Sequence, residues 1–441
     1  MTRTKYIDKQ SKLLFRPLYS RIVMLLMLFS YFYNLPVLNY SVKGNNELRL
    51  YDLVGVLVLM IVVLNRPFVV GYIKSKTHFR YLNNFMLWCG FSLIFTAAFS
   101  LAKGRPLWII QTFLYYYHFL VFFFTAVLLS LYLRVKGNYR WLASFILILA
   151  TAEAILVFLQ HYRVVPFLWN DIYKSAYGLF LSGTLGPNKI VLGMVMFITL
   201  TFATGLLFQK QLKVNRILII TTITVCLATI IISGSRTTYL ALLVYLCYLF
   251  ISTTKKFFVL SVVISLAVMV GFFLNLELIE TAVTTIQNRV IDKVSDPQAF
   301  KENNIDVIQL YEDLGAGRDR LSLIYLDYIF RNPYVIPFGI GLNNRLLVGY
   351  SAHNIYLSLI NEVGLVGLFL YSRWLTSYFY LKLGKMRYLK LALNGLIISM
   401  LVTLFFGEHL YIYRPLFGIL GYFLVVTILF ISPRYYFKSG R

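Results

Sequence analysis

The sequence predicts an all-α membrane protein: a polytopic bundle of about 12 transmembrane helices with one long, partly helical extracytoplasmic loop. Of its 441 residues, 59% are hydrophobic and 17% aromatic, and only 13% are charged. A soluble domain has too little interior for this much apolar surface, whereas a bilayer is itself an apolar solvent. The apolar residues also fall into separate stretches of roughly the 20 residues that a helix needs to cross the hydrocarbon core.

The stretches divide the chain into three parts. Residues 1–275 contain the first nine predicted spans, residues 276–353 form the long loop, and residues 354–441 contain the last three spans and a tail. The predicted spans lie near residues 18–37, 50–65, 82–102, 107–133, 141–160, 189–208, 217–234, 237–252, 257–275, 354–377, 391–407 and 413–432.

Basic residues predict the orientation of these spans. Lys and Arg in short loops are retained on the cytoplasmic side, so basic connections predict that both termini are cytoplasmic. The same rule explains the formal net charge of +25 without a nucleic-acid partner, and we expect none. The first apolar stretch lacks a small-residue cleavage site, so we expect no cleaved signal peptide. The predicted cytoplasmic connections, each free of Asp and Glu, are 66–80, 134–140, 210–216, 254–256 and 373–390.

The loop at 276–353 differs from these connections in length and charge. It carries ten acidic and seven basic side chains, whereas the rest of the chain carries seven acidic and 35 basic ones. A long acidic loop can be translocated, so we expect it on the outer face. Between Asp319 and Ile329 the apolar residues are spaced as one helical face, which predicts a short amphipathic helix.

Sequence patterns for metal or nucleophile chemistry are missing. There is no HExxH, GxSxG or phosphate-binding P-loop pattern, so we expect no cofactor and no metal bound by protein ligands. Cys89, Cys226 and Cys247 lie in apolar runs without a CxxC spacing, and we interpret all three as small core residues.

Two polar clusters lie at predicted outer ends of spans. Residues 182–189, Ser-Gly-Thr-Leu-Gly-Pro-Asn-Lys, combine a tight turn with a helix start, where Asn188 either caps the helix or contacts an anion. Residues 234–237, Gly-Ser-Arg-Thr, form a turn between two spans. Arg236 opposes the positive-inside rule there, so it either extends its charge to the interface or binds an anionic ligand.

Further polar residues lie in the long loop and after it. Arg318 and Arg320 follow the glycines of Gly315-Ala-Gly317, and a solvated loop with surface ion pairs is the simpler interpretation. His353 and Asn354 precede the tenth span, and Glu362 lies inside it, where a carboxylate is usually paired or functional. Another outer cluster contains Glu408, His409 and Arg414, for which a structural Glu408–Arg414 ion pair is favoured over catalysis.

Together these clusters resemble the O-antigen ligase and polysaccharide polymerase family of bacterial membrane glycosyltransferases. The His353-Asn354 to Glu362-Val-Gly-Leu-Val-Gly segment is the most specific part. Thr238 departs from the family pattern, in which glycine or alanine often follows the Arg-Thr pair. The other matching pieces, in family order, are Gly-Pro-Asn at 186–188, Ser-Gly-Ser-Arg-Thr at 233–237, Gly-Arg at 317–318 and Asn-Pro to Phe-Gly-Ile-Gly at 332–341.

The resemblance implies a metal-independent glycosyltransferase at the periplasmic face of the bacterial inner membrane. Its donor would be a glycan on undecaprenyl pyrophosphate. A polymerase would transfer this glycan to another lipid-linked repeat unit, and a ligase to lipid A-core. The long loop favours the polymerase, for which a chain-length regulator protein is a candidate partner. A flippase of lipid-linked sugars is a third alternative, but we find no internal repeat of the kind that many transporters show.

The family chemistry suggests roles for individual residues. We expect Arg236 and Arg318 to bind the pyrophosphate and His353 to act on the acceptor hydroxyl. Glu362 is expected to pair within the bundle instead. The other residues expected to contact substrate are Asn188, Lys189, Arg320, Asn354 and Arg414; for the two asparagines, helix capping is the alternative.

Overall fold

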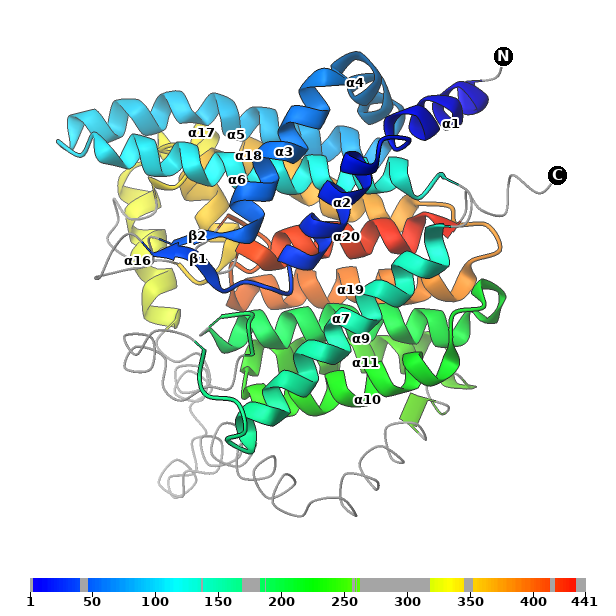
Figure 1. Ribbon diagram of the computed structural model, residues 1–441. Coiled ribbons are helices and arrows are strands. Elements are labelled where there is room, and N and C mark those ends of the chain that lie inside the picture. The colour runs from blue at the N-terminus through cyan, green and yellow to red at the C-terminus, as the bar shows by residue number, and fades with distance from the viewer. Residues whose placement is uncertain are drawn as a thin grey trace, which may run out of the picture.

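A computed structural model shows a bundle of long, roughly aligned helices (Figure 1). Its only strands among the described residues, β1 (Pro36–Asn39) and β2 (Glu47–Arg49), form one short antiparallel hairpin. The predicted all-α membrane bundle is therefore confirmed. The structure describes residues 3–39, 47–135, 138–168, 183–186, 188–255, 258, 260–261, 318–344, 352–412 and 417–433.

The helices follow the apolar stretches of the sequence, because each buries its backbone hydrogen bonds internally and leaves apolar side chains outside. Those before the loop are α1 (Arg3–Leu14), α2 (Leu18–Ser30), α3 (Leu50–Leu64), α4 (Arg66–Ser75), α5 (Thr77–Ala102), α6 (Leu107–Tyr132), α7 (Asn138–His161), α9 (Lys189–Phe208), α10 (Arg216–Ser233) and α11 (Arg236–Ser252). The helices within the long loop and after it are α16 (Arg318–Arg331), α17 (Val335–Phe338), α18 (Ile355–Ser377), α19 (Arg387–Thr403) and α20 (Phe417–Ile431).

Seven of the described helices are long and apolar enough to cross a membrane. The number rises to nine if each of two bent helix pairs is counted as one span. Two shorter apolar helices, α11 and α20, join them. Each predicted span thus coincides with a described helix, except the one at 257–275, most of which lies outside the described residues. The predicted count of 12 stays a prediction.

Two predicted boundaries are wrong. The span predicted at 18–37 ends as a helix at Ser30 and is followed by the β1–β2 hairpin. The predicted connection at 66–80 is largely helical, since α4 and the first turn of α5 occupy it. Two pairs of consecutive helices are sharply bent, and each bend has a proline. Pro17 precedes α2, which lies at 85° to α1, and Pro67 lies in the first turn of α4, which lies at 91° to α3.

The core of the bundle is formed by α9 and α20. Of the 20 residues of α9, 17 are buried, and every described side chain of α20 is buried as well. Helices nearer the outside keep large apolar side chains exposed, as expected for a lipid-facing surface. Cys89 and Cys226 are buried as predicted, but Cys247 is exposed on α11, so its assignment to the core was wrong.

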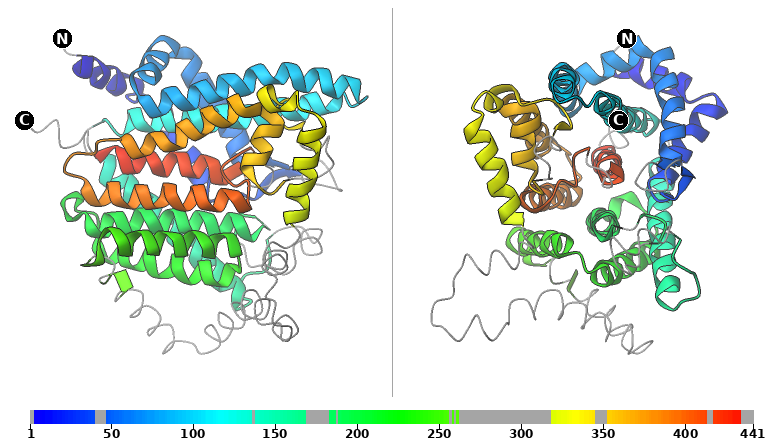
Figure 2. Two further views of the ribbon diagram at one scale, coloured as in Figure 1. Left: turned by 180° about the vertical axis from the view of Figure 1, so that it is seen from behind. Right: turned by 90° about the vertical axis from the view of Figure 1, so that its left-hand side faces the viewer.

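The two ends of the bundle differ. At one end lie α1, α4 and the last turn of α20 (Figure 1). At the opposite end lie the β1–β2 hairpin, α16 and α17, with α16 crossing the bundle end in both views of Figure 2. The polar clusters singled out in the sequence gather at this second end, which we call the α16 end.

Candidate functional site

The turn between α10 and α11 presents Arg236 at the α16 end. Gly234 ends α10 with a left-handed backbone (φ 62°), a conformation that glycine adopts without a Cβ penalty. Ser235 then caps α11, since its side chain accepts from the Thr238 N–H at 3.4 Å. Arg236 is the first residue of α11, and its side chain is half-buried. The short turn therefore places an arginine in the first turn of a helix, where the helix dipole favours anions.

The start of α9 lies against this turn. A Cβ on Gly193 would stand 2.4 Å from the Thr238 hydroxyl oxygen, so only glycine permits the approach of α9 to α11. Asn188 caps α9 by accepting from the Ile190 N–H at 2.9 Å, which confirms the capping interpretation. Lys189 is the first residue of α9 and is half-buried. The first turns of α9 and α11 are thus neighbours.

A buried carboxylate fixes the turn before α9. Glu153, in the second half of α7, is 5% exposed, and its Oε1 accepts from the N–H of Thr184 at 2.6 Å and of Leu185 at 3.2 Å. Its Oε2 lies 2.8 Å from the Thr184 hydroxyl. Gly183 has φ 57°, and a Cβ there would stand 2.1 Å from Oε1. The turn can therefore close on Glu153 only with glycine at position 183.

The same turn connects to a buried arginine near β2. Asn34 donates to the Leu185 carbonyl at 2.7 Å, and Arg49 donates from Nη1 to the Asn34 side-chain oxygen at 3.0 Å. Arg49 is 5% exposed and Asn34 3%. Sequence reasoning missed Glu153, Asn34 and Arg49. Glu153 carried a usable signal, an acid within an apolar stretch, but the other two carried none.

On the other side of the bundle, the end of the long loop packs into a break in α18. Gly364 interrupts α18 with φ 70° and ψ −177°. The break leaves carbonyls without their helical partners, and the loop supplies donors: Ile340 N–H bonds the Asn361 carbonyl and Gly341 N–H the Glu362 carbonyl, both at 2.8 Å. The Phe-Gly-Ile-Gly segment thus brings its backbone into direct contact with the broken helix.

Gly364→Ala is expected to lower the free energy of unfolding by about 2 kcal/mol or more, because a residue other than glycine at this φ and ψ costs about 1–3 kcal/mol before any clash. A Cβ on Gly364 would stand 2.2 Å from the Pro337 carbonyl oxygen. Gly384→Ala is the matched control, since Gly384 has φ 60° and nothing within 4 Å of its Cβ position. Thermal unfolding of both variants in detergent measures the difference. Equal melting temperatures would contradict the packing described.

Glu362 lies at the centre of this packing. Its side chain is 0% exposed, and Oε2 accepts from the Asn343 N–H at 2.8 Å and from the Tyr411 hydroxyl at 3.1 Å. The carboxylate therefore joins the loop, α18 and the segment before α20, as its predicted role within the bundle requires. Glu408 is also buried and accepts from the Ser358 hydroxyl. Its predicted partner Arg414 lies outside the described residues.

His353 lies immediately before α18 at the α16 end. Its backbone is left-handed (φ 49°), which is uncommon for a residue other than glycine and often marks a functional position. The side chain is half-buried. Asn354 caps α18, accepting from the N–H groups of Tyr356 at 3.0 Å and Leu357 at 3.4 Å. Capping is thus confirmed for Asn354 as well, and a contact of either asparagine with substrate stays a prediction.

Contacts through α19 place the start of α18 level with Arg236. Tyr356 donates to the Leu401 carbonyl at 2.7 Å, so α18 begins beside the end of α19. Tyr245 of α11 packs against Gly395 of the antiparallel α19. Arg236 precedes Tyr245 by nine residues, or about 13 Å of helix, which brings it level with the last turn of α19. The guanidinium and imidazole groups therefore belong to the same end of the bundle.

The amphipathic helix predicted in the loop is α16. Ile329 of its last turn belongs to a small apolar cluster against which Phe99 of α5 packs, and its first turn lies toward the side formed by α9, α10 and α11 (Figure 2). Arg318 and Arg320 belong to that first turn. The glycines at 315 and 317 lie outside the described residues. The helix thus spans the α16 end from one polar cluster toward the other.

The α16 end combines cationic side chains, three capped helix starts and an imidazole. Such a set can bind a phosphate-rich ligand and accept a proton from a hydroxyl. Among the described residues, no three His, Cys, Asp or Glu side chains converge as a metal site would require. The fold defines a multi-pass membrane protein whose described polar clusters gather at one end.

Residues 218–372 match the family described as O-Antigen ligase. The resemblance stated from the motifs is therefore confirmed over this segment, which is similar to a family of glycosyltransferase-like membrane proteins. The matched segment contains α11, α16, α17 and most of α10 and α18, hence Arg236, Arg318 and His353, but not α7 or α9. A comparison with curated proteins gives no match.

Proposed function

We propose that the protein polymerises a cell-surface polysaccharide on the outer face of the bacterial inner membrane. It would transfer a glycan from undecaprenyl pyrophosphate to another lipid-linked repeat unit. The observation that supports this proposal most is the position of Arg236 and His353 at one bundle end, within the segment that matches the O-antigen ligase family. Polymerase is preferred to ligase because a loop of this length can cover two glycan lipids.

The chemistry needs charge stabilisation and proton removal. The acceptor hydroxyl attacks the sugar C1, the bond from C1 to the pyrophosphate oxygen breaks, and the lipid pyrophosphate leaves with an additional negative charge. Arg236, and Arg318 from the first turn of α16, bind the pyrophosphate oxygens, since guanidinium groups stay charged and form paired hydrogen bonds. His353 accepts the proton of the attacking hydroxyl. The starts of α9 and α11 add N–H groups to the anion site.

Reconstitution of the purified chain with a single lipid-linked repeat unit tests the proposal. A polymerase produces a ladder of glycan lengths on the lipid. A ligase, which the family description favours as the second candidate, consumes the donor only when lipid A-core is added. A flippase leaves glycan length unchanged under both conditions, and that result would overturn the proposal of an enzyme.

His353→Asn is expected to slow chain growth by about 10²-fold or more, the typical contribution of a positioned general base. Asparagine tolerates the left-handed backbone better than alanine does, so this variant removes the imidazole with little strain. His161→Asn is the matched control, because His161 ends α7 at the same bundle end but lies outside the motif. Initial rates on purified lipid-linked substrate give the comparison. Full activity of the His353 variant would refute the assigned role.

A further inference from the structure

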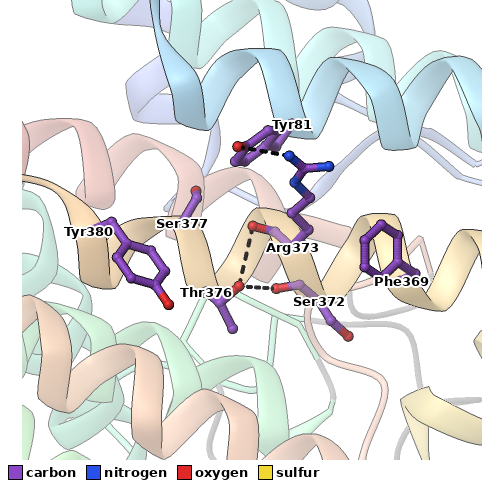
Figure 3. Close-up of a pocket in the computed structure, with 7 residues that line it drawn as sticks. All are labelled: Tyr81, Phe369, Ser372, Arg373, Thr376, Ser377 and Tyr380. Carbon is purple, nitrogen blue, oxygen red and sulfur yellow. Dashed lines mark hydrogen bonds between the residues drawn. The ribbon is translucent and has the colours of Figure 1, made fainter.

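A cavity of about 390 Å³ opens on the outside of the bundle between α5 and α18, far from the α16 end. Figure 3 shows its lining, with Tyr81 from α5 facing Arg373 from α18. Phe369 lies before the arginine on α18, Tyr380 lies in the short 3-10 turn after that helix, and Ser372 and Thr376 add hydroxyl groups. The cavity therefore combines a cation, hydroxyls and aromatic rings at one point of the outer surface.

The depth of the cavity matches a membrane boundary. Arg373 follows Ile355, the first residue of α18, by 18 residues, which is at most about 27 Å of rise because Gly364 breaks the helix between them. A hydrocarbon core is about 30 Å thick, so a helix that starts at one boundary brings Arg373 close to the other. Tyr81 likewise lies in the second turn of α5, at the same end as α4. This is the end that the basic connections predict to be cytoplasmic.

The Arg373 guanidinium is fixed by an aromatic ring and stays available to an anion. Its carbon lies 4.3 Å from the Tyr81 ring centroid, and Nη2 donates to the Tyr81 hydroxyl at 3.2 Å. The side chain is exposed, and within the described part of the chain no acidic residue pairs with it. A fixed, unneutralised guanidinium at a bilayer boundary matches the phosphate of a lipid headgroup.

The surroundings of the guanidinium suit the rest of a lipid. Phe369 is 61% exposed and lies toward the membrane interior along α18, where an acyl chain would run. Tyr380 is 83% exposed beyond the other side of Arg373, at the depth where headgroups lie. We propose that this cavity is a binding site for an anionic phospholipid, with the phosphate on Arg373 and the acyl chains along α5 and α18.

Native mass spectrometry of the purified full-length protein tests the site. The protein is titrated with phosphatidylglycerol, with phosphatidylcholine and with inorganic phosphate. The wild-type chain is expected to retain phosphatidylglycerol preferentially. Arg373→Gln is expected to weaken that retention about tenfold, the effect of losing one hydrogen bond to a charged group. Arg373→Lys keeps the charge but lacks the planar group, so its retention of phosphatidylglycerol is expected to lie between those of the wild type and Arg373→Gln.

Arg387→Gln is the matched control, because Arg387 is an exposed arginine at the same bundle end, outside the cavity. It should retain phosphatidylglycerol as the wild type does. Three results would overturn the proposal: equal retention by Arg373→Gln and the wild type, equal retention of the anionic and zwitterionic lipids, or displacement of the lipid by millimolar phosphate. The last result would show a site for free anions instead.

Discussion

Arg236→Ala is expected to reduce glycan polymerisation by about 10²- to 10³-fold, the usual effect of removing one donor that stabilises charge in a transition state. The reason is geometric as well as electrostatic. Gly234 and Ser235 fix the backbone of the first residue of α11, so the arginine is attached at a fixed point before substrate binds. The measurement is the rate at which a lipid-linked repeat unit is converted to longer glycans by purified protein.

Two further variants separate charge from geometry and from folding. Arg236→Lys keeps the charge but loses the paired hydrogen bonds, so an intermediate rate is expected. Arg216→Ala is the matched control: Arg216 also begins a helix after a capping residue, Asn215, but at the opposite end of the bundle. Full activity of Arg236→Ala, or equal losses in Arg236→Ala and Arg216→Ala, would contradict the anion site at the α16 end.

The helices were predictable because a bilayer imposes a length and a composition on each span. A continuous apolar stretch near 20 residues has few alternatives to a transmembrane helix. Bends are not coded by hydropathy, and the helical path of residues 66–75 was missed for that reason. Pro67 marked the position, but proline at a helix start and proline in a loop look alike in the sequence.

The site was predictable only in part. Arg236 and Glu362 were conspicuous because ionised side chains in apolar surroundings need a reason. The hydrogen-bond partner of such a side chain could not be predicted, since it can lie at any distance along the chain. Glu362 binds the Asn343 N–H, 19 residues before it, and the Tyr411 hydroxyl, 49 residues after it. Neither the residue type of these two partners nor their distance from Glu362 in the sequence indicates that they bind the carboxylate.

Glu153→Ala is the second change with a large expected effect. It removes the acceptor of two buried N–H groups and the neighbour of one hydroxyl in the turn before α9. An unsatisfied buried polar group costs about 1–3 kcal/mol, so a loss of several kcal/mol of stability is expected. The turn leads directly into Asn188 and Lys189, and its disorder should also raise the apparent KM for the lipid-linked donor.

Glu153→Gln is expected to be much milder, for a reason found in the hydrogen-bond geometry. The Thr184 hydroxyl has one hydrogen, yet its oxygen lies 2.5 Å from the Phe32 carbonyl and 2.8 Å from Glu153 Oε2. The hydroxyl cannot donate fully to both oxygens. If it donates to the Phe32 carbonyl, its oxygen can accept a hydrogen bond from a donor at the position of Glu153 Oε2. The glutamine amide supplies one, while its oxygen still accepts from the Thr184 and Leu185 N–H groups.

A glycine pair provides the control for the backbone. Gly183→Ala brings a Cβ to 2.1 Å from Glu153 Oε1, whereas Gly104→Ala, at a similar φ of 64°, meets nothing within 4 Å. The difference between their melting temperatures isolates the contact with Glu153 from the cost of a left-handed alanine. If Glu153→Ala and Gly183→Ala both unfold at the wild-type temperature and keep the wild-type KM, the carboxylate does not position the turn. A glutamine variant as damaged as the alanine one would instead show that the site requires the ionised carboxylate.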